Sequence, residues 1–268
     1  MESVGEHPVP VGPLAVRWLG YELPQLRAGV AAPARLLLRN DGSATWRSRR
    51  ETGVQVSYHW LDDLGNAIVW DGPRVAFARP VAPGEEVEVE TLLRAPQPPG
   101  RYRLAFDLVE EFRFWFEEIG SSPLHLDVDV LPRIAERRLG VVVHGGASAE
   151  TAAALAAQDE PLVETGAVAT AHLVAGAIPE PDWSRRVLDA HAEGFAAVGG
   201  SLETRERSLR AWAPGGGRDP AFGRPLLLPS LLVGIDPGEH LGLPAYSGES
   251  ALFDGRIRLR LPRGRRRG

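Results

Sequence analysis

The stretch Asn40-Asp-Gly-Ser-Ala-Thr-Trp46 separates two runs in which apolar and polar residues alternate. Asn, Asp and Gly favour tight turns, and the tryptophan that follows can anchor a core. The alternation recurs up to Val130, and a period of two places one set of side chains on a buried face. Short strands separated by turns predict an antiparallel β-sandwich over residues 14–130. Further runs of this kind cover Ala34–Arg39, Val54–Leu61, Ala67–Trp70, Tyr102–Val109 and Phe112–Phe116.

Composition limits the classes of protein that fit this chain. It has 268 residues, a net charge of −5 and 44% hydrophobic residues, which suffices for a buried core in two domains. Cysteine is absent, so disulfides, thiolate zinc sites and a cysteine nucleophile are excluded. All 30 basic residues are arginine, so there is no lysine for a Schiff base or a P-loop. A pI near 5.9 does not favour nucleic acid as a partner.

The second half of the chain alternates apolar runs with helical segments. Residues 131–138 break the strand pattern and are the expected linker, whereas residues 1–13 and 263–268 are expected to be tails. This order predicts an α/β domain with a mostly parallel sheet over residues 139–262. The expected elements are a strand over Leu139–Val143, a helix capped by Ser148, a strand over Val168–Ala175, a helix from Asp182 to Glu193, and a strand over Phe195–Leu202.

The first domain resembles the four-tryptophan type of Ig-like domain. The N-x-G-x-x-W spacing of Asn40 to Trp46 is followed by Val81-Ala-Pro-Gly-Glu85 and by Pro99-Gly-Arg-Tyr102, in the order that this family shows. The resemblance implies an Ig-like sandwich, and bacterial relatives of such modules are often joined to enzymes of surface-glycan synthesis. The five tryptophans of this half are expected to pack in the core or, alternatively, to offer a stacking platform for a sugar ring: Trp18, Trp46, Trp60, Trp70 and Trp115.

The second domain resembles a reduced, degenerate glycosyltransferase of family 2, which has the GT-A fold. The resemblance is carried, in order, by Leu155-Ala-Ala-Gln-Asp-Glu-Pro161, by Ile178-Pro-Glu-Pro-Asp-Trp183 with the glycines up to Gly200, and by residues 241–260. The metal-binding Asp-x-Asp motif of that family falls on Val174-Ala-Gly176, which has no side-chain oxygen. Residues 159–171 are too few for the strand and loop that hold the donor nucleotide, so this half of the donor site is expected to be deleted.

The resemblance to transferases implies several candidate site residues. Asp254 aligns with the acidic acceptor motif and is the expected catalytic base, and Glu249 lies close enough in sequence to substitute for it. Arginines can hold a diphosphate through paired hydrogen bonds, and tryptophans can stack on a sugar. The expected carbohydrate- or phosphate-binding residues are Trp183, Trp212, Arg256, Arg258 and Arg260. No metal ligand is expected, and Mn²⁺ or Mg²⁺ with a nucleotide sugar would be needed only by an active transferase.

Other motifs are incomplete. The strand before His144-Gly-Gly resembles that of an esterase, but the Gly-x-Ser-x-Gly elbow is missing. No two histidines have metal-ligand spacing, and His59 is expected to point outward from a strand. Pro214-Gly-Gly-Gly-Arg218 lacks the rest of a P-loop. The tail Arg263-Gly-Arg-Arg-Arg-Gly268 could support a peripheral contact with an anionic membrane.

Three functions remain open from the sequence. The first is a glycosyltransferase-like protein of bacterial surface-polysaccharide metabolism that has lost donor chemistry and binds or scaffolds. The second is an active, metal-independent sugar transferase, and the third is a non-enzymatic module in which the Ig-like domain binds a protein. The expected partners are a glycan, a nucleotide sugar or glycan-synthesis proteins. No signal peptide and no membrane span are visible, so we expect a cytoplasmic location, with at most peripheral contact at the inner face of the membrane.

Overall fold

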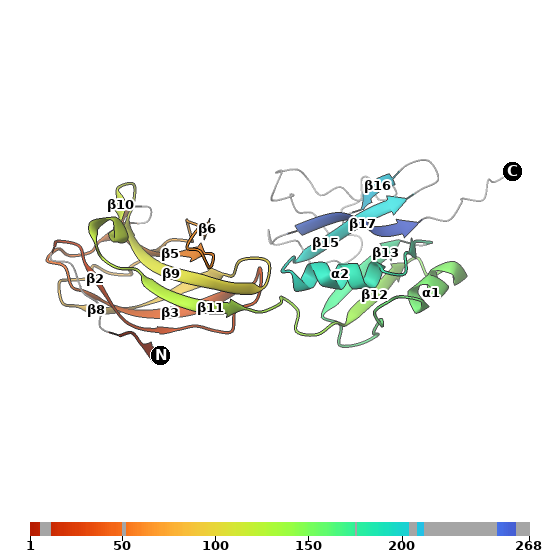
Figure 1. Ribbon diagram of the computed structural model, residues 1–268, viewed down its shortest axis with the longest axis horizontal. Helices are drawn as coiled ribbons and strands as arrows, with labels where there is room; N and C mark the ends of the chain where they lie inside the picture. Colours follow the sequence, from red (N-terminus) through yellow and green to blue (C-terminus); the bar gives the residue numbers. More distant parts are fainter. Residues whose placement is uncertain (6–11, 50–51, 175, 204–207, 212–250, 261–268) are drawn as a thin grey trace. The chain divides into compact units, whose positions relative to one another are not determined.

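A computed structural model describes residues 1–5, 12–49, 52–174, 176–203, 208–211 and 251–260. The chain divides into two compact units, Met1–Leu131 and Pro132–Gly268, and each is described by itself. Strands dominate the described residues, which confirms the prediction of a β-rich fold (Figure 1). The predicted site residues Trp212 and Glu249 lie outside the described residues.

The first unit consists of two antiparallel sheets. One has the order β1-β2-β3-β8, and the other has the order β10-β9-β5-β4, with β11 paired to β9 and with β6 and β7 paired to β5. The strands of the first sheet are β1 (Glu2–Ser3), β2 (Val16–Glu22), β3 (Ala31–Asn40) and β8 (Glu86–Arg94). Those of the second are β4 (Ser48–Arg49), β5 (Thr52–Leu61), β6 (Ala67–Val69), β7 (Val75–Ala76), β9 (Gly100–Glu110), β10 (Phe114–Trp115) and β11 (Leu124–Val130).

Both sheets of the first unit contribute to a single hydrophobic core. Leu36 and Leu38 on β3 belong to the same buried cluster as Trp60 on β5 and Phe106 on β9. The alternation seen in the sequence produces this core, because every second residue of these strands faces inward. A 3₁₀ helix, Phe116–Ile119, follows β10 and adds a fully buried phenylalanine.

The segment from Asn40 to Trp46 ties distant parts of the first unit together. The buried Asn40 side chain accepts a hydrogen bond from the Gly42 N–H at 3.0 Å and donates to the carbonyl oxygens of Ala44 and Val81, both at 2.9 Å. Trp46 and Val81 exchange two backbone hydrogen bonds of 3.0 Å. A Cβ at position 42 would lie 2.3 Å from the Pro13 carbonyl oxygen, so only glycine fits there.

The central strand β5 is buried on both of its faces. Val54, Val56, Tyr58 and Trp60 face the core, while the residues between them, including His59, are also buried. The prediction that His59 points outward to solvent is therefore wrong, since its side chain is only 2% exposed. The reason is a second layer of chain: Trp70 stacks on the imidazole at 4.2 Å between ring centroids, and Trp115 contacts it edge-on at 4.3 Å.

The described residues of the second unit form two small sheets and two helices. β12 pairs with β13 in parallel, and the other sheet has the order β14-β17-β15-β16, in which only β15 and β17 run parallel. A mostly parallel sheet was expected, but the described strands form a mixed arrangement. The reason is that the short strands β14 and β16 pair antiparallel with β17 and β15. The elements are β12 (Leu139–His144), α1 (Ala149–Ala156), β13 (Ala169–Val174), β14 (Ile178–Pro179), α2 (Trp183–Ala192), β15 (Ala197–Glu203), β16 (Ser208–Ala211) and β17 (Ala251–Arg260).

The helices of the second unit begin near the predicted positions. The Ser148 hydroxyl accepts a hydrogen bond from the Thr151 N–H at 3.0 Å and caps α1, as the sequence predicts. The helix α2 packs against β17 and β15 and buries Val187 and Leu188 in the core of this unit. Within the described part of the chain, no helix has both the length and the apolar character needed to cross a membrane.

Candidate functional site

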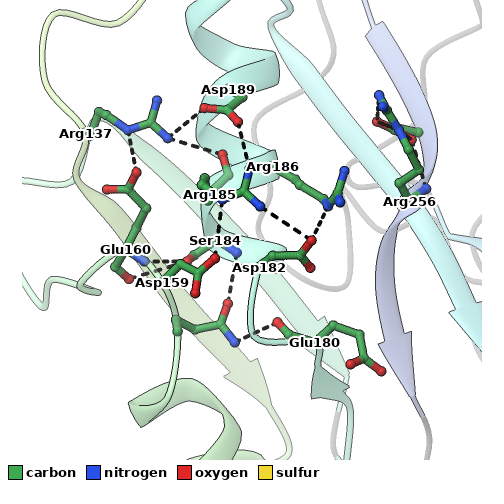
Figure 2. Close-up of polar contacts among 12 residues, drawn as sticks. Arg137, Asp159, Glu160, Glu180, Asp182, Ser184, Arg185, Arg186, Asp189 and Arg256 are labelled. Carbon is green, nitrogen blue, oxygen red and sulfur yellow. Dashed lines mark hydrogen bonds and ion pairs between the residues drawn. The ribbon is translucent and has the colours of Figure 1, made fainter.

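The first candidate site lies in the second unit, where two segments of the transferase resemblance meet. The Gln158 side chain donates to the carbonyl oxygens of Ala154 at 3.0 Å and Glu180 at 2.9 Å, and it accepts from the Ser184 N–H at 2.9 Å. Gln158 thus joins the end of α1, the loop before α2 and the first turn of α2. Figure 2 shows this junction and the charged side chains around it.

The charged side chains at this junction are paired with one another. Arg137 binds Glu160 at 2.7 Å and Asp189 at 2.8 Å, and Arg186 binds Asp182 at 2.5 Å (Figure 2). Such exposed or half-exposed pairs contribute little stability individually, but a network of them fixes the positions of the segments it joins. These ion pairs give the charged residues a structural role. Among the described residues, no three of the carboxylates converge in a way that could hold a metal ion.

Asp254, the predicted base, is held by its own strand. Its Oδ1 accepts a hydrogen bond from the Arg256 N–H at 2.8 Å, and its Oδ2 lies 2.7 Å from Arg256 Nη2. The hydrogen bonds from the Arg256 side chain hold the pKa of Asp254 below its usual value. A general base works best when its pKa lies near the operating pH, so this ion pair makes Asp254 a weak base.

The strand pairing next to Asp254 is irregular. In the register of β15 with β17, Gly200 lies opposite Asp254, whereas the next residue, Ser201, lies opposite Arg258. Residues 255–257 therefore bulge out of β17, and the Asp254–Arg256 contacts join the strand to the middle residue of that bulge. This is a structural role for Asp254, which the spacing of the sequence motif could not show.

We expect Gly200→Ala to destabilise the second unit by about 3 kcal/mol, at the upper end of what overpacking costs. A Cβ at this position would lie 2.1 Å from the Ile257 carbonyl oxygen, and the backbone there is held between two strands. Differential scanning calorimetry of the full chain would show the loss as a lower melting temperature of one transition. Gly146→Ala is not a suitable control because its φ is +88°, whereas Gly5→Ala meets nothing within 4 Å and should leave both transitions unchanged.

The remaining predicted residues do not converge on one site. Trp183 is 3% exposed and packs in the core of the second unit, so it is a packing residue and offers no surface for a sugar. Arg260 pairs with Glu180 at 2.7 Å, and the Arg258 carbonyl oxygen accepts from the Glu180 N–H at 3.1 Å. The described ranges contain no cluster of three or more His, Asp or Glu side chains placed to hold a metal.

A second candidate site lies on the first unit, at the loop that follows β6. Of the five tryptophans there, four are at most 8% exposed, whereas Trp70 is 47% exposed. The ring of Trp70 stacks on that of His59 with an interplanar angle of 28°, and its carbonyl oxygen is hydrogen-bonded to His59 Nδ1. Burial lowers the pKa of His59, so the imidazole under Trp70 is neutral at pH 7.

Charged side chains border this tryptophan. Asp71 pairs with Arg74 at 2.8 Å, and the Arg74 guanidinium lies over Trp115, with its carbon 4.6 Å from the ring centroid. Arg74 also contacts the Ser57 hydroxyl and Glu111. The sequence did offer a signal for this site. Trp70 is followed by Asp-Gly-Pro, a turn sequence, and a tryptophan in a turn is more exposed than one inside a strand.

Comparison with known proteins gives structural similarity only. No protein-family model matches the chain, and no curated protein matches it either. Among solved structures, the C-terminal domain of Wzt aligns with 12% identity over 44% of this chain and 75% of its own, with a TM-score of 0.32. The CARDB domain of the PF1109 protein from Pyrococcus furiosus aligns with 18% identity over 47% and 95%, with a TM-score of 0.26. A family 123 glycoside hydrolase from Clostridium perfringens aligns with 9% identity over 44% and 25%, also with a TM-score of 0.26. These scores establish no family.

Proposed function

We propose that this chain is a glycosyltransferase-like protein of bacterial surface-polysaccharide metabolism that binds or scaffolds and does not transfer sugar. In this proposal the first unit is an Ig-like sandwich and the second is a reduced GT-A-like domain. The observation that carries the proposal is the pairing of the Asp254 carboxylate with Arg256, a residue inside the bulge of β17. An acidic residue that maintains its own strand is poorly suited to deprotonate an acceptor.

Two further observations support the loss of transfer chemistry. The positions expected for the Asp-x-Asp motif are Val174-Ala-Gly176, which offer no carboxylate to neutralise a leaving diphosphate. In addition, the charged residues around Gln158 are engaged with one another, and Trp183 is buried. We therefore favour binding or scaffolding over an active metal-independent transferase. The partners in this proposal are a glycan or the proteins that synthesise it.

The full chain is expected to show no metal-dependent binding of nucleotide sugars. The test is a thermal-shift and calorimetric screen with UDP-, GDP- and dTDP-sugars, each with and without Mn²⁺ or Mg²⁺. A ligand of the folded state at 100 times its dissociation constant would raise stability by about 2.7 kcal/mol, which both methods detect. We expect no such shift and no release of nucleoside diphosphate.

Asp254→Asn serves as the matched variant for this screen, because it removes the charge and retains most of the side-chain shape. If the wild-type chain binds a nucleotide sugar at micromolar concentration and turns it over, and Asp254→Asn does not, the chain is a transferase and the proposal fails. Turnover that persists in Asp254→Asn also overturns the proposal and places the base elsewhere, with Glu249 as the next residue to test.

A further inference from the structure

We propose that the first unit binds a neutral sugar ring on the Trp70 face, by which we mean Trp70, Asp71 and Arg74 above the buried His59 and Trp115. This inference deepens the proposed function and rests on it, since it assigns the glycan contact to one surface. All residues of the Trp70 face belong to the first unit, and so its test is separate from the nucleotide-sugar screen.

The indole of Trp70 is held in place before any ligand arrives. One of its faces stacks on His59 at 4.2 Å, and Trp115 contacts it edge-on at 6.1 Å between ring centroids. The hydrogen bond between His59 and the Trp70 carbonyl oxygen fixes the backbone of the same residue. His59 covers one face of the ring, yet Trp70 as a whole remains 47% exposed and so keeps surface that a ligand can reach. A preformed platform loses little conformational entropy on binding, which favours affinity.

The chemistry of the Trp70 face fits a sugar. A pyranose ring has an apolar face of C–H groups and a rim of hydroxyls, and the C–H groups pack on the negative face of an indole. Asp71 follows Trp70 in the sequence and pairs with Arg74, and the two side chains offer the acceptors and donors that hydroxyls require. The Asp71 side chain is 68% exposed, so one partner of this ion pair is accessible to a ligand.

The charges near the platform select for a neutral glycan. The charges of Asp71 and Glu117 act on the supporting His59. Glu111 and Asp71 both pair with Arg74, the one positive charge that these contacts include. This excess of negative charge disfavours a sugar acid such as a uronate. The apolar surface that β6 adds is also small: the partly exposed Ile68 and Val69 point to opposite faces of the strand, so only one of them can lie on the side of the indole. A stable protein interface buries about 800 Å² per partner, which exceeds such a platform.

Affinity electrophoresis of the full chain tests this proposal. Native gels would contain a neutral polysaccharide (dextran, yeast mannan or laminarin) or an acidic one (alginate). We expect at least one neutral polysaccharide to retard the wild-type chain and alginate to have no effect. Trp70→Ala should weaken the retarding interaction at least tenfold, and Trp70→Phe should restore part of it, because phenylalanine keeps an aromatic face.

The control variant is Leu92→Ala, which removes a side chain of similar exposure (55%) from β8, a strand of the other sheet. It should bind like the wild type. Calorimetry of each variant shows whether the first unit still unfolds cooperatively, and Trp70→Phe provides a folded comparison if Trp70→Ala does not. No retardation by any neutral polysaccharide overturns the proposal. Retardation that Trp70→Ala and Trp70→Phe leave unchanged also overturns it, while leaving the proposed function standing. Failure of the proposed function would appear instead as nucleotide-sugar turnover.

Discussion

Replacement of Trp46 by alanine is expected to lower the free energy of unfolding of the first unit by about 3–5 kcal/mol. The side chain is fully buried, stacks on Phe77 at 5.4 Å and contacts Phe116 edge-on at 6.1 Å. These three rings come from separate segments of the chain, so alanine would leave a cavity that no single neighbour can fill. Calorimetry of the full chain measures the loss, and the transition of the second unit is identified by its sensitivity to Gly200→Ala.

Trp46→Phe is the control for this prediction. It keeps an aromatic ring in the stack but removes the indole N–H, which is buried and has no hydrogen-bond partner among the residues that the structure describes. An unsatisfied buried donor costs roughly 1–3 kcal/mol, so its removal offsets part of the lost packing. We expect Trp46→Phe to cost less than half as much as Trp46→Ala. A loss below about 1 kcal/mol for Trp46→Ala would contradict the assignment of this residue to the core.

The second large effect is a loss of stability of the first unit as the pH rises from 4 to 8. Burial raises the pKa of Asp107 to about 7, and the charges of Glu117 and Glu118 add to the effect, while hydrogen bonds from the Leu108 and Glu117 N–H groups oppose it. The unfolded chain releases this proton near pH 3.9. Between the two values the unfolded state is ionised and the folded state is not, which favours unfolding. The shift of roughly 3 pKa units corresponds to about 4 kcal/mol, lost progressively from pH 4 and fully lost above pH 7.

Asp107→Asn isolates this contribution from that of His59. Burial lowers the pKa of His59, so this residue acts in the opposite sense and costs stability as the pH falls below about 6.5. Both proteins contain His59, so its contribution cancels when the unfolding free energy of the wild type is subtracted from that of Asp107→Asn. We expect this difference to change in favour of the variant by about 4 kcal/mol between pH 4 and pH 8, as measured by urea unfolding. If the unfolding free energies of the two proteins instead change in parallel with pH, the pKa of Asp107 is not raised and the prediction fails.

Local sequence chemistry predicted much of the fold. The turn at Asn40, the cap at Ser148 and the alternation over Ala34–Arg39 each depend on residues within a few positions of one another, and the structure contains all three. The predicted strand over Phe112–Phe116 is shorter in the structure, where β10 covers only Phe114–Trp115. The reason is backbone conformation: Phe112 has a φ of +64°, which no strand contains, and the 3₁₀ helix begins at Phe116.

The candidate sites were less predictable because they depend on distant contacts. A period-two pattern assigns His59 to the solvent face, and nothing near it in sequence reveals that Trp70 and Trp115 cover that face. The resemblance to transferases selected Asp254 by alignment, but the bulge that engages it arises from its pairing with β15. Trp183 follows a turn-like segment and reads as exposed, yet it begins α2 and faces the core because of how that helix packs.

The double burial of β5 has a consequence for sequence variation. Strands of an antiparallel sheet usually have one face on which substitutions are tolerated, since it contacts only water. From Val54 to Trp60 no such position exists, because the core lies on one side and the layer of Trp70, Arg74 and Trp115 on the other. In homologues that keep this second layer, these seven positions should vary little and together. In homologues that lack it, Gln55, Ser57 and His59 would be free to diverge while their neighbours in the core stay apolar.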